Sequence, residues 1–154
     1  MLKKIIVFAD ILVIALVAGS VFGIWLGYNP AGLSAGAYLE QQQHAIRSLN
    51  FLMPALGLLG LLLTVAWAII ARSERPVFYM LVFAAICFIA SGLITRFGNQ
   101  PINAVVMTLN PHLLPETWMN LRDQWWHWHS ARTVTSVAGL FFLLLANAME
   151  QRKQ

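Results

Sequence analysis

The sequence predicts an all-α fold, a bundle of four transmembrane helices in a single domain spanning residues 1–154. Hydrophobic residues make up 59% of the chain and charged residues only 10%, whereas a soluble domain typically carries about 25% charged residues. The mean hydropathy is +0.69. Four apolar segments approach the length of about 20 residues that crosses a bilayer. These segments are Ile5–Leu26, Leu49–Ala71, Val77–Ile94 and Thr133–Met149.

The first apolar segment is expected to be a retained transmembrane helix. A stripe of small residues recurs at every fourth position: Gly19, Gly23 and Gly27. Such a stripe lets another helix approach closely, either within the bundle or in a homo-oligomer. The alternative is a cleaved signal peptide, which the paired lysines at 3–4 and the small residues at 18–20 would suit. The apolar run continues to Leu26 and is longer than a usual signal core, which favours the retained helix.

The second and third segments form a predicted antiparallel hairpin, because only the short polar stretch 72–76 separates them. The connection before the second segment is much longer. Within it, Ser34 is a predicted N-cap, and Tyr38–Asn50 is predicted to run as a helix into the second segment. The face of this helix carries Glu40, His44 and Arg47 at steps of four and three.

The connection between the third and fourth segments contains a second predicted short helix, Pro101–Leu109. A proline suits the first turn of a helix, and Asn110 and Pro111 end the pattern. We expect Asn99 and Asn103 either to cap backbone groups near this helix start or to contact a substrate. The final helix is predicted to begin near Pro115 and to reach Met149. His112, in the loop between them, is expected to be solvated.

The distribution of basic residues predicts that both termini are cytoplasmic. In a four-span arrangement six basic residues fall on the side of the termini: Lys3, Lys4, Arg72, Arg75, Arg152 and Lys153. Four fall on the other side: Arg47, Arg96, Arg122 and Arg132. The first group sits in short connections, where the positive-inside rule applies best. The protein is therefore expected to be a multi-pass protein of a bacterial inner membrane, with the long connections on the outer side.

One face of the final helix carries polar and aromatic side chains directly before the fourth apolar segment. Trp118, Arg122, Trp125, His129 and Arg132 follow one another at steps of four, three, four and three. At about 100° per helical residue they fall within about 80° of one another. Interfacial anchoring to lipid headgroups is the simpler explanation of such residues. The alignment of five of them on one stripe favours the wall of a pocket.

The same residues, in their order along the chain, resemble the anthrone oxygenase-like family. The resemblance rests on Gln43, Asn50 and Pro54, on Asn99-Gln-Pro-Ile-Asn103, and on Trp118, Arg122, Trp125, His129 and Arg132. Members are small four-helix membrane proteins, long catalogued as a domain of unknown function. Some are implicated in oxidising anthrones to anthraquinones without an established flavin or nicotinamide. The resemblance covers nearly the whole chain and implies an oxidoreductase or oxygenase.

A cofactor-independent oxygenation would assign clear roles to the stripe. His129 would be the general base, since an imidazole titrates near neutral pH. Arg122 and Arg132 would hold the oxyanion of an enolate or phenolate, and Trp118 and Trp125 would stack on a flat phenolic or ketonic substrate. The further residues expected around the substrate are Asn99, Asn103, His44, Arg47 and Arg96.

Two other functions remain open at this point. A haem or metal ion could be held by His44 and His129, which begin neighbouring segments, although no cofactor is favoured. His127 cannot join His129 in such a site, because residues two apart on a helix point about 200° apart. If His127 has a local partner, it is expected to be Asp123. Alternatively, a non-enzymatic binding or assembly subunit would hold a lipid, quinone or partner helix in the same pocket.

The sequence argues against an ATP-using enzyme, a zinc protease and a serine hydrolase. The sequence contains no Gly-rich phosphate loop, no His-Glu-x-x-His pair, no nucleophile elbow and no cluster of cysteines. The net charge of +4 comes from basic residues at the ends of apolar segments, so it does not indicate nucleic-acid binding. Asp10 is the one acidic residue well inside an apolar segment, and it is expected to have a function, to cap or to snorkel toward the interface.

Overall fold

A computed structural model describes residues 1–110 and 113–152, and these are helical or in short connections, without β-strands. His112 and Lys153 lie outside the described residues. Four stretches are long and apolar enough to cross a membrane, as expected of an integral membrane protein. These stretches are Leu2–Gly32, Leu52–Ile70, Arg75–Val106 and Trp118–Gln151. The number of candidate spans agrees with the four that the sequence predicts.

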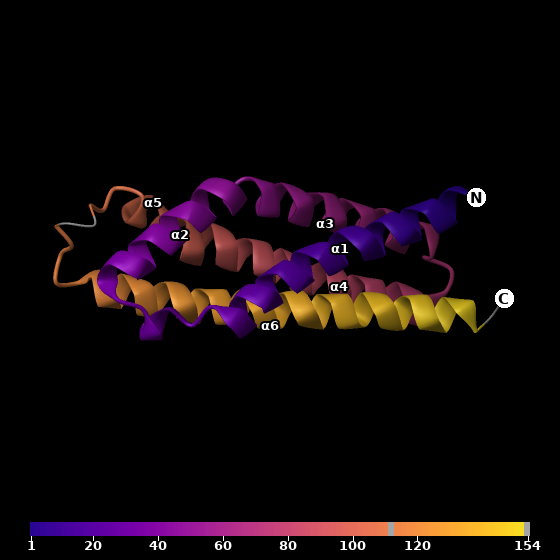
Figure 1. Ribbon diagram of the computed structural model, residues 1–154. Helices are drawn as coiled ribbons and strands as arrows, with labels where there is room; N and C mark the ends of the chain where they lie inside the picture. The colour runs from indigo at the N-terminus through magenta and orange to yellow at the C-terminus, as the bar shows by residue number, and fades with distance from the viewer. Residues whose placement is uncertain (111–112, 153–154) are drawn as a thin grey trace.

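The long helices lie side by side in one elongated bundle (Figure 1). They are α1 (Leu2–Gly27), α3 (Leu52–Ile70), α4 (Arg75–Ile94) and α6 (Trp118–Gln151). The start of α1, the end of α6 and the turn between α3 and α4 lie at one end, which we call the terminal end (Figure 1). The opposite end, called the site end, holds the short helices α2 (Ala35–Leu49) and α5 (Gln100–Val106) and the start of α6.

The third span does not stop where the sequence suggested. A π-helical turn, η2 (Thr95–Asn99), joins α4 to α5 without a break. The short helix predicted at Pro101–Leu109 is present as α5, but it continues from α4 and ends at Val106. Pro101 follows the π-helical turn directly. Its ring would clash with the carbonyl group four residues earlier in a regular α-helix, and a widened turn relieves this clash.

The start of α5 follows a helical turn without a break, and the predicted capping role of Asn99 and Asn103 is not observed. The Asn99 side chain makes no capping hydrogen bond. Instead, the π-helical turn brings α4 close to α6 at Gly98. A Cβ atom at Gly98 would overlap the ring of Trp128, so this close approach requires a glycine.

The helix before the second span ends within one residue of the predicted position, but it does not run on into that span. Ser34 caps α2 as expected, since its Oγ accepts a hydrogen bond from the Ala37 N–H. However, α2 ends at Leu49, and α3 starts separately at Leu52. Pro54 explains the break, because it lacks an N–H and fits only in the first turn of α3. The final helix likewise begins at Trp118, three residues after Pro115.

The bundle buries some large apolar side chains between its helices and exposes many others on its outside. Trp67, Leu81 and Leu143 are fully buried between the helices. Phe8, Leu62 and Phe141 are each more than half exposed on the outside. In a soluble protein such an extensive apolar surface would mark an interface. Here it is the surface that a bilayer would cover.

Helix α1 has an outward-facing glycine stripe and a buried acidic residue, Asp10. α1 packs against α3 and α6, as a retained helix would. Its glycine stripe, Gly19, Gly23 and Gly27, faces outward, with no side chain or neighbouring helix within 4 Å of a Cβ built there. Asp10 does not snorkel: it is fully buried, and its Oδ1 accepts a hydrogen bond of 3.1 Å from Thr64 Oγ1.

Candidate functional site

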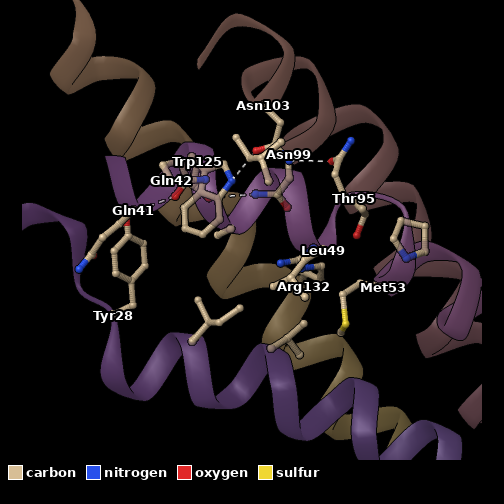
Figure 2. A pocket seen from close by; sticks show the side chains of 16 residues that line it. Tyr28, Gln41, Gln42, Leu49, Met53, Thr95, Asn99, Asn103, Trp125 and Arg132 are labelled. Carbon is tan, nitrogen blue, oxygen red and sulfur yellow. Dashed lines mark hydrogen bonds between the residues drawn. The ribbon is translucent and has the colours of Figure 1, made fainter. Parts of the chain in front are cut away.

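A cavity of about 260 Å³ lies at the site end, between α1, α2, the start of α3, α5 and α6. We call it the polar cavity, because many of its lining side chains carry hydrogen-bonding groups. These are Tyr28, Gln41, Gln42, Asn50, Thr95, Asn99, Asn103, Trp125 and Arg132. Figure 2 labels all of them except Asn50 and shows the labelled side chains converging from several helices, with Arg132 near the middle.

The stripe predicted on α6 faces the bundle. Trp125 and His129 are buried, and Trp118, Arg122 and Arg132 are half-buried. Of these five, Trp125 and Arg132 line the polar cavity. The prediction that these five side chains share one face of α6 is therefore confirmed. Only two of them reach the cavity, and the other three pack beside it or further along α6.

His129 is fully buried and makes hydrogen bonds through both ring nitrogens. Its Nδ1 lies 2.8 Å from Nη2 of Arg132, and its Nε2 lies 3.1 Å from the backbone carbonyl of Val21. A guanidinium only donates, so Nδ1 must accept and Nε2 must carry the proton. The imidazole also stacks on Trp125, with 4.9 Å between ring centroids and 6° between the planes, and on Trp126. His129 is thus a neutral imidazole whose position is fixed by two hydrogen bonds and by stacking on two indole rings.

Arg132 has no acidic partner within the described residues. The ion pairs there join Lys3 to Glu74 and Glu150, and Arg122 to Asp123. The guanidinium of Arg132 donates to His129, while its Nε is buried without a hydrogen-bond partner. A cation withdrawn from water is strongly unfavourable unless it is paired. The side chain lines the polar cavity, so an acidic oxygen placed there would be its partner.

A chain of amide and indole hydrogen bonds fixes the wall opposite α1. Asn103 Nδ2 donates to Asn50 Oδ1, and Trp125 Nε1 donates to Asn103 Oδ1. Asn99 Nδ2 donates to the backbone carbonyl of Trp125 at 3.1 Å. These bonds join the α2–α3 junction, η2, α5 and α6 (Figure 2). Asn99 Oδ1 is left buried without a partner, and it is an acceptor at the cavity.

Arg122 and Trp118 form a separate group, further along α6. The Arg122 guanidinium lies 5.2 Å above the Trp118 ring and pairs with Asp123. Trp118 packs against Tyr38, whose pKa is raised by burial. Neither Arg122 nor Trp118 lines the polar cavity. The structure therefore brings Arg132, and not Arg122, to His129.

The polar cavity is not lined by four other residues considered in the sequence: His44, Arg47, Arg96 and His127. His44 and Arg47 are exposed on α2 and do not line the polar cavity. Arg96 is exposed and donates to Gln100 Oε1. His127 contacts Asp123, as expected, but through the backbone carbonyl.

The geometry gives a metal or haem no ligand set of the predicted kind. His44 is exposed, while both nitrogens of the buried His129 are engaged in hydrogen bonds. Within residues 1–110 and 113–152, no group of three or more His, Cys, Asp or Glu side chains could hold a metal ion.

Gln42 was missed in the sequence, and Gln43 was noted only for the family resemblance. Gln42 is buried and bonds to the Tyr28 hydroxyl, with 3.2 Å between oxygens. Gln43 Nε2 donates to the backbone carbonyls of Val106 and Leu109 and so holds the end of α5. A signal for Gln42 was present, because it shares the buried face of α2 with Leu39 and Ile46 at helical spacing.

Comparison with known sequences assigns the chain to a family. Residues 43–142, about two thirds of the chain, match the sequence profile of the family described as anthrone oxygenase. The matched range contains most of the polar cavity and the whole stripe on α6. The chain matches no curated protein and no solved structure. The chain belongs to the anthrone oxygenase family.

Proposed function

We propose that this protein is a membrane oxidoreductase of the oxygenase type, which acts on a flat, hydrophobic phenolic or ketonic molecule in the polar cavity. The observation that carries the proposal is Arg132, a guanidinium without an acidic partner among the described residues, directed at a cavity in a member of this family. An enolate or phenolate oxygen is the ligand that would complete its pairing.

Arg132 would act by stabilising negative charge on the substrate oxygen. A fixed donor in a site with little water stabilises such charge far better than the same donor in water. Asn99 Oδ1 would accept a hydrogen bond from a second hydroxyl of the substrate, since it is buried without a partner. The indole of Trp125 lines the cavity and would contact the flat ring.

The proposed reaction balances without a further reductant. The enol form of an activated methylene ketone binds, and its hydroxyl proton leaves to solvent. The electron-rich enolate carbon then forms a bond to O₂, and a proton completes the hydroperoxide. Loss of water from this hydroperoxide leaves a new carbonyl group. One oxygen atom of O₂ enters the product and the other leaves in water.

In this arrangement His129 is a positioning residue. Its Nδ1 accepts from Arg132, and its Nε2–H is anchored on Val21. The sequence-based hypothesis made His129 the general base. That role requires Arg132 to release Nδ1, since a lone pair engaged in a hydrogen bond cannot accept the substrate proton.

The direct test is oxygen consumption by the purified protein in mild detergent, with a dihydroxyanthrone as substrate and the quinone product followed by absorbance. Arg132→Gln should lower kcat by about 10²- to 10³-fold, the usual effect of removing an oxyanion donor. The matched control is Arg47→Gln, because Arg47 is exposed and lines no part of the polar cavity. Equal activity of both variants would reject the assignment of Arg132.

We also propose that the terminal end faces the cytoplasm of a bacterial cell and that the site end, with α2 and α5, faces the opposite side of the inner membrane. The basic residues described at the terminal end support this orientation: Lys3, Lys4, Arg72, Arg75 and Arg152. The outward-facing stripe of Gly19, Gly23 and Gly27 leaves association with a second copy of the chain as a further proposal.

A further inference from the structure

A second cavity, of about 360 Å³, continues from the polar cavity toward the middle of the bundle. Five residues line both cavities: Val21, Met53, Pro54, Thr95 and Arg132. The two cavities therefore meet at the Arg132 side chain. Together they reach the size of about 300–1,000 Å³ that is usual for small-molecule sites.

The wall of the second cavity is largely apolar, and we call it the apolar cavity. Its polar residues are Ser91, Thr95, Arg96, Gln100, Arg132 and Ser136. Arg96 donates to Gln100 Oε1. Ser91 Oγ and Ser136 Oγ bond to each other, with 2.8 Å between them. Thr95 Oγ1 donates to the Ser91 carbonyl. The rest of the wall is largely apolar and includes Ile14, Val17, Ala18, Leu61, Phe88 and Ile89. Hydrocarbon is the ligand chemistry that such a wall accepts.

The apolar cavity reaches the outside of the bundle between α3 and α4. Three lining side chains there are about half exposed: Leu58 at 58%, Ile89 at 47% and Leu93 at 52%. Gly57 and Gly92 also line it, and each has open space where a Cβ would be. This part of the surface lies within two of the membrane-spanning stretches. A ligand could therefore enter from the bilayer.

We infer that the substrate is amphipathic, with an acidic, oxygen-bearing ring system at Arg132 and a hydrocarbon tail in the apolar cavity. The inference rests on the proposed function for the chemistry of the ring system. The tail follows from volume, because protein interiors are otherwise close-packed and a flat ring system would leave the larger cavity empty. Entry between α3 and α4 suits a molecule that already resides in the membrane.

The test measures binding and not turnover, under anaerobic conditions, by calorimetry in one mild detergent. The ligands are a dihydroxyanthrone without a side chain and homologues with alkyl chains of increasing length. Gly57→Leu and Gly92→Leu would each place a side chain in the apolar cavity from a different helix. Gly36→Leu is the matched control, because Gly36 is an exposed helical glycine that lines neither cavity.

We expect either substitution in the apolar cavity to lower the affinity for the long-chain homologue by about tenfold or more, because the added side chain overfills the space that the alkyl chain needs. Binding of the ligand without a chain should stay within about twofold of the wild type, as it should for both ligands in Gly36→Leu. The inference is overturned if both cavity variants bind the long-chain homologue as the control does. Equal weakening of both ligands would also overturn it, since that indicates a general distortion.

The same titrations separate this inference from the proposed function. Arg132→Gln removes the proposed partner of the ring system and leaves the glycines of the apolar cavity in place. If Arg132→Gln binds the ligand without a chain as the wild type does, the proposed function fails. A chain-dependent loss in Gly57→Leu would still stand in that case. If only the chain dependence is missing, the tail is rejected and the oxyanion site is not.

Discussion

Arg132 and His129 form a hydrogen-bonded pair one helical turn apart, with 2.8 Å between Nη2 of the arginine and Nδ1 of the imidazole. The pair fixes the protonation of the ring, because the arginine can only donate. It also fixes the direction of the guanidinium, since the far side of the ring is anchored on the Val21 carbonyl. A residue of α1 thereby orients a cation that α6 presents to the polar cavity.

This pairing predicts different results for two substitutions of His129. His129→Asn places an amide oxygen near the position of Nδ1, so it can still accept from Arg132, and kcat should stay within about tenfold of the wild type. His129→Ala removes the acceptor and lets the guanidinium move, and kcat should fall by about 10²-fold, the usual effect of a misplaced group. The measurement is anthrone-dependent oxygen consumption for both variants, with folding checked by circular dichroism.

The same comparison discriminates between positioning and base catalysis. An asparagine has no basic nitrogen, so a general-base role predicts that the Asn and Ala variants are equally impaired. It also predicts that the acid limb of the pH–rate profile disappears in both. Either result would return His129 to the role of base.

The hydrogen bond from Trp125 to Asn103 should contribute measurably to stability. Trp125→Phe keeps an aromatic ring beside His129 but leaves Asn103 Oδ1 without its donor. The free energy of unfolding should fall by about 0.5–1.5 kcal/mol, the usual net contribution of one hydrogen bond, since Asn103 is only partly buried. Thermal unfolding in detergent measures this. Trp25→Phe is the control, since Trp25 is 43% exposed and makes no such bond; equal losses would contradict the expectation.

Gln43 should hold the end of α5 in place. Its Nε2 donates to two backbone carbonyls, those of Val106 and Leu109, each at 3.0 Å. Gln43→Ala leaves both groups to solvent, and we expect faster amide hydrogen exchange across 100–109. Exchange in α4 should not change. Gln41, the first residue of the same glutamine run, makes no such bridge, so Gln41→Ala should leave the exchange unaltered.

The regular parts of this fold could be predicted from the sequence because they depend on local patterns. The apolar segments predict the four candidate spans, and Ser34 predicts the start of α2. The helical spacing predicts that His129 faces the bundle and that His127 faces away from it. Helical periodicity depends only on residues a few positions apart, so it survives in any tertiary context.

The irregular parts depend on contacts between distant segments, which periodicity does not report. Pro101 predicts a helix start, and α5 does begin beside it, but the π-helical turn that joins α5 to α4 has no signal in the sequence. Arg122 and Arg132 were equivalent in the sequence. Only the fold shows that Arg122 has Asp123 and Trp118 as partners while Arg132 has a cavity. The apolar cavity likewise arises from helices whose packing leaves space between them.

The most direct test of the central claim is the absorption spectrum of a dihydroxyanthrone bound to the protein, recorded at neutral pH without oxygen. If Arg132 holds the oxyanion, binding to the wild type should convert the ligand to its enolate, which absorbs at longer wavelength than the neutral form. Arg132→Gln should bind the ligand in its neutral form. A neutral spectrum in the wild type, or the same enolate spectrum in both proteins, would contradict the account.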